Sequence, residues 1–309
     1  MYRSEQWYRE LRGKKLETPL FIPSYRRPDA PIFTKGKLKD IMLPDWTFVF
    51  IRDDKDEYQA YCHLQHMVTL VPLPKRVCDI NTTKESMVQF GLKHDYTNVF
   101  IFDDRVLDVR TLIPRVTRNG KDVMGVAPFS TPYDSLLLWE FLHNYFPTTA
   151  SMPAPAGNSW FPANINRDFT VNKPGGSWVC YCLNIQDVNE HNIHMGTWDT
   201  HGVEDMYLLY QIMKAGLPSR VFTDLEFKEV YPERMAALGT RTGGNATSPL
   251  PRSERIKQGK ITFCHNVLGI EVGQKNPEVS FRPSDSEGFT MRFNFARYWS
   301  KYYEEHKIK

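Results

Sequence analysis

The sequence lacks the features of several protein classes. It has no uninterrupted run of about 18 apolar residues, the length that a membrane-spanning helix needs. Its first residues are charged and aromatic and do not resemble a signal peptide. Cysteine is scarce, with five in 309 residues and no CxxC pair, so neither a disulfide framework nor a zinc knuckle is indicated. We therefore expect a soluble protein with reduced thiols.

Composition and charge are those of an ordinary globular chain. The formal net charge is +3 at neutral pH, and hydrophobic and charged residues make up 41% and 24% of the sequence. The length fits one large domain, or one domain with an appended lobe. A mildly basic charge permits a nucleic-acid partner without indicating one.

Short apolar runs that end in polar residues predict the core of the fold. They cover residues 19–23, 46–51, 67–73 and 98–102. Near-continuous apolar runs of this length are typical of strands in a parallel sheet, which is buried on both faces. Thr82 and Glu85 have capping-box spacing, which predicts the start of a helix between the third and fourth strands. The pattern indicates an α/β fold with a mostly parallel sheet.

The second half of the chain is less regular. Residues 178–185 predict another strand, and residues 203–215 predict a helix. Residues 147–177 are rich in Pro, Gly and Asn and predict long loops. Residues 234–260 carry basic residues among Gly, Ser, Thr and Pro, and predict a mobile basic loop.

Polar clusters follow three of the predicted strands, at residues 24–27, 53–54 and 103–105. The carboxyl ends of parallel strands share one edge of a sheet, and ligands bind at that edge. We therefore expect the three clusters to converge there.

The acidic pair Asp103-Asp104 is the first candidate site. Two carboxylates at a strand end suit a hard cation that bridges a diphosphate, although a solvated turn has the same sequence. Tyr25 can stack on a base, and the planar fork of Arg26 can bind phosphate oxygens. Lys84, near a predicted helix start, can add charge for the diphosphate, or can simply be exposed.

Glu204 and Asp205 are candidates for a general base. Both lie in the first turn of a predicted helix, where the helix dipole keeps a carboxylate ionised, as in any well-capped helix. They point about 100° apart, so one can face a cleft while the other packs locally. His265, late in the chain, is either a metal ligand or a structural histidine.

In this order, the motifs resemble those of the GT-A glycosyltransferases. The likeness covers residues 18 to about 270 and rests on the loop Ser24-Tyr25-Arg26-Arg27-Pro28, on Asp53, on Asp103-Asp104, on Glu204-Asp205 and on His265. It implies a GT-A fold, which is a Rossmann-like α/β sheet with flanking helices and long acceptor-side loops. It also implies one domain over residues 1–309, with a nucleotide-sugar half at 18–125 and an acceptor half with a C-terminal tail at 126–309.

The resemblance assigns roles to individual residues. Around the nucleotide sugar it places Pro23, Ser24, Tyr25, Arg26, Asp53, Lys84, Asp103, Asp104 and Arg105. Asp104 and His265 would hold a divalent metal, Mn²⁺ or Mg²⁺. Asp205, or its neighbour Glu204, would deprotonate an acceptor hydroxyl in an inverting displacement. Arg105 stands where similar relatives have a third aspartate, so either two ligands hold the metal or Arg105 supplies part of the positive charge.

A narrower likeness concerns the acceptor. The segments PSYRRP, IFDDR and GVEDMYLLYQIMKAG are similar to those of the bacteriophage TET-associated glycosyltransferases and of the 5-hydroxymethylcytosine arabinosyltransferases of T4-like phages. This likeness implies a UDP-sugar donor and hydroxymethylated DNA as acceptor, in the cytoplasm of an infected bacterium. Basic residues would contact DNA phosphates and aromatic rings would stack on an extruded base. The acceptor-side residues are His201, Trp178, Arg241, Arg252, Arg255 and Lys257.

Two alternatives remain open. A GT-A enzyme for a polysaccharide or small-molecule acceptor predicts no salt-sensitive DNA binding. A non-enzymatic DNA-binding or virion protein that keeps the fold as a scaffold predicts that Asp205→Asn has no effect.

Overall fold

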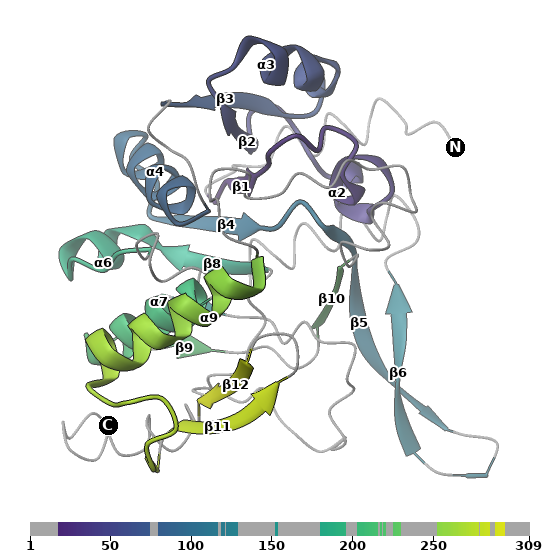
Figure 1. Cartoon of the computed structure of the whole chain (residues 1–309). Coiled ribbons are helices and arrows are strands. Elements are labelled where there is room, and N and C mark those ends of the chain that lie inside the picture. The colour runs from purple at the N-terminus through teal and green to yellow at the C-terminus, as the bar shows by residue number, and fades with distance from the viewer. Residues whose placement is uncertain are drawn as a thin grey trace.

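A computed structural model gives the fold of most of the chain (Figure 1). The structure describes residues 18–74, 80–116, 119–120, 122–128, 152–153, 180–195, 203–215, 217, 219–220, 225–229, 252–277, 279–284 and 288–293. No helix within these ranges is long and apolar enough to cross a membrane.

A five-stranded sheet forms the centre of the molecule, with the strand order β3-β2-β1-β4-β8. Its strands are β1 (Leu20–Pro23), β2 (Thr47–Arg52), β3 (Thr69–Leu73), β4 (Asn98–Phe102) and β8 (Cys180–Asn184). The first four are parallel to one another, and β8 runs antiparallel to β4. The predicted α/β class with a mostly parallel sheet is confirmed.

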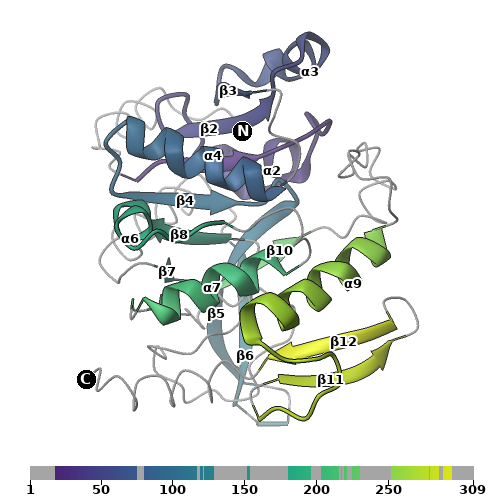
Figure 2. The same ribbon diagram turned by 60° about the vertical axis from the view of Figure 1, so that its left-hand side comes forward.

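Hydrophobic cores cover both faces of this sheet, because alternate side chains of a strand point to opposite faces. On one face, Leu20 and Ile22 pack with α2 (Pro31–Thr34) and η1 (Lys37–Asp40). On the other face, Phe21 belongs to a second core that includes residues of three helices (Figure 2). These helices are α4 (Ile80–Lys93), α6 (Ile185–Glu190) and α7 (Glu204–Lys214).

The rest of the described chain forms smaller units. A three-stranded antiparallel sheet contains β5 (Val106–Val116), β6 (Asp122–Pro128) and β10 (Leu225–Glu229). Two short strands, β7 (Met152–Pro153) and β9 (Ser219–Arg220), pair in parallel. Helix α9 (Arg252–Thr262) continues into the π-helical turn η5 (Phe263–Leu268) and the hairpin β11 (Val279–Ser284) and β12 (Gly288–Phe293). Helix α3 (Lys55–Tyr61) and the turn η2 (Cys62–Leu64) join β2 to β3.

Two expectations about local structure were wrong. Helix α4 begins at Ile80, so Thr82 lies inside the helix and does not form a capping box at its start. The second part of the expected basic loop 234–260 is helix α9, which starts at Arg252, while residues 234–251 lie outside the described part. Most of the loop predicted at 147–177 also lies outside it.

Gly91 lets α4 approach the sheet closely. A Cβ atom at this position would lie 2.5 Å from Cδ1 of Ile185 and 3.4 Å from side-chain atoms of Phe21 and Val99, all buried. We expect Gly91→Val to destabilise the fold by about 1–3 kcal/mol, measured by urea unfolding, because overpacking a dense core forces neighbours to shift. Gln89→Val, on the exposed side of α4, is the control and should change stability by no more than about 0.5 kcal/mol. Equal effects at the two positions would contradict the close packing.

Candidate functional site

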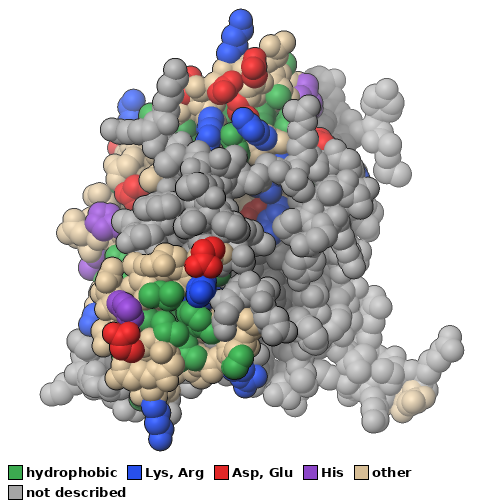
Figure 3. All heavy atoms as spheres, in the orientation of Figure 1, with side chains coloured by type: hydrophobic (Ala, Val, Ile, Leu, Met, Phe, Trp, Pro, Cys, Tyr) green, Lys and Arg blue, Asp and Glu red, His purple; other side chains and the backbone are tan. Residues whose placement is uncertain are grey.

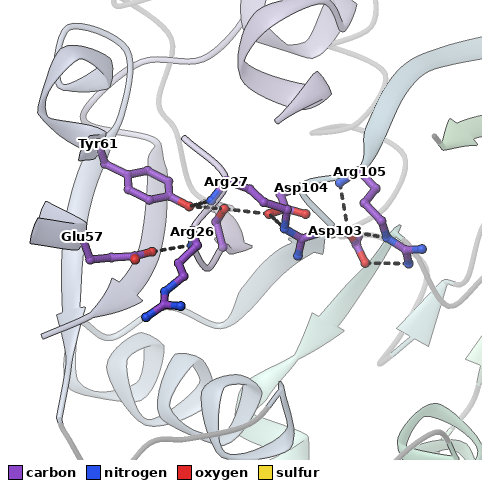
Figure 4. A network of polar contacts seen from close by, with 8 residues as sticks. Arg26, Arg27, Glu57, Tyr61, Asp103, Asp104 and Arg105 are labelled. Carbon is purple, nitrogen blue, oxygen red and sulfur yellow. Dashed lines mark hydrogen bonds and ion pairs between the residues drawn. The ribbon is translucent and has the colours of Figure 1, made fainter. Parts of the chain in front are cut away.

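Helix α3 fixes the loop that follows β1. The backbone N–H of Arg26 donates to Glu57 Oε1 at 2.6 Å, and that of Arg27 donates to the Tyr61 hydroxyl at 2.9 Å (Figure 4). Asp54 caps α3 by accepting hydrogen bonds from two backbone N–H groups in its first turn, which fixes the helix in place. Arg26 adopts a left-handed conformation, with φ at 55°, and its side chain is exposed. The loop is thus held with an arginine projecting at the edge of the sheet.

The sequence interpretation missed Glu57 and Tyr61. They lie four residues apart, so they share one face of α3, and both are buried against the loop. Burial is the main cause that raises the pKa of each side chain above its ordinary value. The signal available in the sequence was an acidic residue and a tyrosine four residues apart, shortly after a strand end.

Asp104 joins the first and fourth strands. The Ser24 hydroxyl donates to Asp104 Oδ2 at 2.7 Å, and Arg27 Nε lies 3.1 Å from the same oxygen (Figure 4). Because the one Ser24 proton is used there, the Tyr61 hydroxyl, 2.7 Å from Ser24 Oγ, donates to Ser24. Asp104 is fully buried, and burial raises its pKa to about 7 although Arg27 lowers it. This cluster confirms that the ends of β1 and β4 meet.

Asp103 is bound by its neighbour Arg105. Arg105 Nε donates to Asp103 Oδ1 at 3.1 Å, and Arg105 Nη2 donates to Asp103 Oδ2 at 2.9 Å. Burial disfavours the charged carboxylate, but the guanidinium outweighs it and lowers the pKa of Asp103. Figure 3 shows basic and acidic side chains together in a recess of this face of the molecule.

The expected metal site does not have a suitable arrangement of ligands. Both carboxylates of the acidic pair already have a guanidinium partner, Arg105 on Asp103 and Arg27 on Asp104. His265 Nε2 lies 2.8 Å from Glu271, in the turn after α9. Within the described ranges, no three His, Cys, Asp or Glu side chains lie close enough together to hold a metal ion. Asp104 Oδ1 is buried and has no hydrogen-bond partner among the described residues. One buried oxygen beside a guanidinium does not make a metal site, because Mg²⁺ and similar ions need several oxygen ligands.

Lys84 and Asp205, 121 residues apart in sequence, form an ion pair between α4 and α7. Lys84 Nζ donates to Asp205 Oδ1 at 2.7 Å. The two side chains are 9% and 20% exposed, so the pair is largely shielded from water. Burial raises the pKa of Asp205 to about 6, although the Lys84 ammonium lowers it. The candidate base is therefore ionised at neutral pH and able to take up a proton.

The remaining predicted residues have separate surroundings. Pro23 is buried at the end of β1, and Asp53 is exposed after β2. The Arg52 guanidinium lies over the Tyr25 ring, 4.1 Å from the ring centroid. Glu204 is half-buried, and its Oε2 has no hydrogen-bond partner among the described residues.

The structure describes few of the acceptor-side residues. His201, Trp178 and Arg241 lie outside the described part of the chain. Arg252 and Arg255 lie on α9, whose side chains at these positions are not described. Lys257 lies 3.9 Å from Glu254 on the same helix.

Comparisons with known proteins give only distant similarity. No protein-family model and no curated protein matches the chain. Residues 1–349 of S. aureus TarS, which were also solved with UDP, share 8% identity over 84% of this chain and 75% of that 1–349 chain, with a TM-score of 0.44. A mycobacterial protein shares 11% identity over 94% and 89% of the two chains, with a TM-score of 0.43. A nucleotide-diphospho-sugar transferase from Desulfovibrio desulfuricans G20 shares 9% over 80% and 96%, with a TM-score of 0.40. These values are too low to assign a family or an activity.

Proposed function

We propose that the chain is a GT-A glycosyltransferase that uses a UDP-sugar as donor. The observation that carries the proposal is that the polar cluster at the strand ends and the candidate base Asp205 act on each other electrostatically. Ser24, Arg27 and Asp104 join the ends of two parallel strands, the edge where nucleotides bind in such sheets. Burial is the largest cause that raises the pKa of the Asp205 carboxyl, and the charge of Asp103 beside this cluster raises it further. A donor edge and a candidate base therefore lie within electrostatic range.

The chemistry is a single displacement with inversion. The Asp205 carboxylate takes the proton of an acceptor hydroxyl while the hydroxyl oxygen attacks the anomeric carbon. The bond from that carbon to the nucleoside diphosphate breaks on the opposite face, and its electron pair leaves with the diphosphate. A base with a pKa near the working pH is the most effective, and the value of about 6 for Asp205 meets this condition.

On the donor side, positive charge comes from arginines. Arg26 is exposed at the loop tip, and Arg27 and Arg105 lie on the acidic pair. Arginine forks match phosphate oxygens and retain their charge at any working pH. In this proposal the nucleotide binds along the loop that Glu57 and Tyr61 hold rigid.

We further propose DNA with a hydroxymethylated pyrimidine as the acceptor. The sequence segments that resemble the phage DNA-modifying glycosyltransferases support this choice. Helix α9 brings basic residues of the 234–260 segment onto an ordered element. Among these basic residues, Lys260 is not available to DNA, because it is buried and donates to the Phe289 carbonyl at 3.4 Å. Lys257, which is more exposed, is a candidate for a phosphate contact.

The test is a transfer assay. The protein is incubated with a panel of UDP-sugars and with DNA that contains 5-hydroxymethylcytosine, and the nucleosides are analysed by mass spectrometry. We expect one sugar to add to hydroxymethylcytosine and none to add to the same DNA with cytosine. UDP-sugar hydrolysis without DNA modification would exclude DNA and leave a polysaccharide or small-molecule acceptor. A protein that neither binds nor turns over any UDP-sugar would contradict the glycosyltransferase assignment and favour a scaffold protein.

A further inference from the structure

Lys84 occupies a position that normally belongs to the core. On α4 it is buried together with Met87, Val88 and Gly91, and these positions form one stripe of the helix that faces the sheet. The Lys84 side chain is 9% exposed, and its ammonium lies 5.5 Å from the centre of the buried Tyr181 ring on β8. A lysine at such a position is costly unless its charge is paired.

The partner of this charge is Asp205, and the pair is not explained by stability alone. A buried ion pair is often no more stabilising than apolar residues of the same volume, because both charges lose their hydration. Met87 and Val88 show that the same helix face accepts apolar residues. Burial disfavours the ammonium form of Lys84, but Asp205 outweighs burial and raises the pKa of Lys84. Lys84 is therefore a permanent cation.

Asp205 is surrounded by groups from four parts of the chain. Burial is the largest cause that raises its pKa, and the charges of Glu204 in α7 and Asp103 after β4 raise it further. Lys84 in α4 lowers it, by its charge and by its hydrogen bond. Tyr181 in β8 is neutral near pH 7, because burial raises its pKa to about 12. Of these four side chains, Lys84 alone favours the ionised carboxylate.

We propose that Lys84 is a positioning residue that keeps Asp205 ionised and oriented, and that it is not a ligand of the donor diphosphate. The inference rests on the proposed function, in which Asp205 is the base. Lys84 bonds Asp205 Oδ1, so Oδ2 is the oxygen that accepts the proton from the acceptor. This role differs from the one that the resemblance implies for Lys84, which is contact with the diphosphate.

The test measures kcat/KM for sugar transfer against pH, because this profile reports ionisation in the free enzyme. In the wild type we expect activity to fall as the pH drops through about 6, where Asp205 takes up its proton. In Lys84→Met the pKa of Asp205 rises, so this acid limb moves to higher pH by about one unit or more, and activity below the limb falls about tenfold per unit. Activity at high pH recovers towards the wild-type value, and the Kd for UDP stays unchanged.

Three further variants separate charge, shape and folding. Lys84→Arg keeps the cation and should keep the limb near its wild-type position. Lys84→Gln keeps an N–H donor without the charge, so it should move the limb as Lys84→Met does, and it replaces Lys84→Met if that protein does not fold. Lys93→Met removes an exposed lysine in the last turn of the same helix and should leave the profile unchanged.

The outcomes distinguish this inference from the proposed function. If Lys84→Met and Lys84→Gln weaken UDP binding tenfold or more while the acid limb stays in place, Lys84 binds the diphosphate and the inference is wrong, although the enzyme assignment stands. If the wild type neither binds UDP nor transfers sugar, both the assignment and the inference are wrong.

Discussion

Asp205→Asn is expected to lower the turnover number by about 10²–10⁴-fold, which is the range for loss of a general base. Asparagine has nearly the shape of aspartate and can still accept a hydrogen bond from Lys84 through its amide oxygen. The buried Lys84 ammonium loses its anionic partner, so urea unfolding of the variant checks that the fold is retained. The amide cannot take up the acceptor proton. The measurement is the initial rate of sugar transfer at saturating UDP-sugar and acceptor, together with the Kd for UDP, which should not change.

The matched control is Glu204→Gln, one residue earlier in the same helical turn. Glu204 is half-buried, and its charge adds to burial, the largest cause, in raising the pKa of Asp205. Removing this charge lowers the pKa of Asp205, so Glu204→Gln should keep its activity and move its acid limb to lower pH. The reverse result, with activity lost in Glu204→Gln and kept in Asp205→Asn, would make Glu204 the base. Full activity in both variants would contradict a base at this helix start.

The sequence predicts the central sheet well because its strands are short and almost wholly apolar. Phe21, Phe48 and Phe50 belong to one aromatic cluster that spans β1 and β2, and aromatic residues are enriched in strands. The direction of β8 was not predictable from its residues. Its run, Cys180 to Asn184, is as buried as the parallel strands, so the apolar pattern does not distinguish an antiparallel from a parallel partner.

The start of α4 shows how a local signal can mislead. Thr82 and Glu85 have the spacing of a capping box, but the chain enters the helix at Ile80. The Glu85 carboxylate is used elsewhere, since its Oε2 accepts a hydrogen bond from the backbone of Met195 at 3.1 Å. The tertiary contact with Met195, and not the capping-box spacing, determines what this Glu85 oxygen binds.

The candidate site was predictable in its location but not in its pairing. Ser24 and Asp104 could be placed at one sheet edge because both follow apolar runs. That Arg27 binds Asp104 and that Lys84 binds Asp205 depends on contacts across 77 and 121 residues, which no local pattern encodes. The sequence placed Arg105 beside the acidic pair as a possible source of positive charge, but the pairing of Arg27 with Asp104 was not part of that prediction.

Removing divalent metal is expected to leave UDP binding by the wild type unchanged, and Arg105→Asp is expected to make binding depend on metal. Arg105 and Arg27 already supply positive charge at Asp103 and Asp104. Losing the Arg105 fork removes a charge-assisted contact worth about 1.5–3 kcal/mol, which corresponds to a loss of affinity of about tenfold to over a hundredfold. The new aspartate gives three consecutive carboxylates, a donor set that suits Mn²⁺ or Mg²⁺.

Calorimetric titration with UDP in EDTA and in Mn²⁺ measures both effects. Arg105→Asp should bind UDP weakly in EDTA and recover in Mn²⁺, whereas Arg105→Met, which adds no carboxylate, should bind weakly in both buffers. Arg27 is less suitable for this test, because removing it leaves the fully buried Asp104 without its cation and costs about 3–5 kcal/mol of stability. Wild-type binding that is lost in EDTA and restored by Mn²⁺ would mean that a metal displaces the arginines from the acidic pair, and that Asp103 and Asp104 act as its ligands.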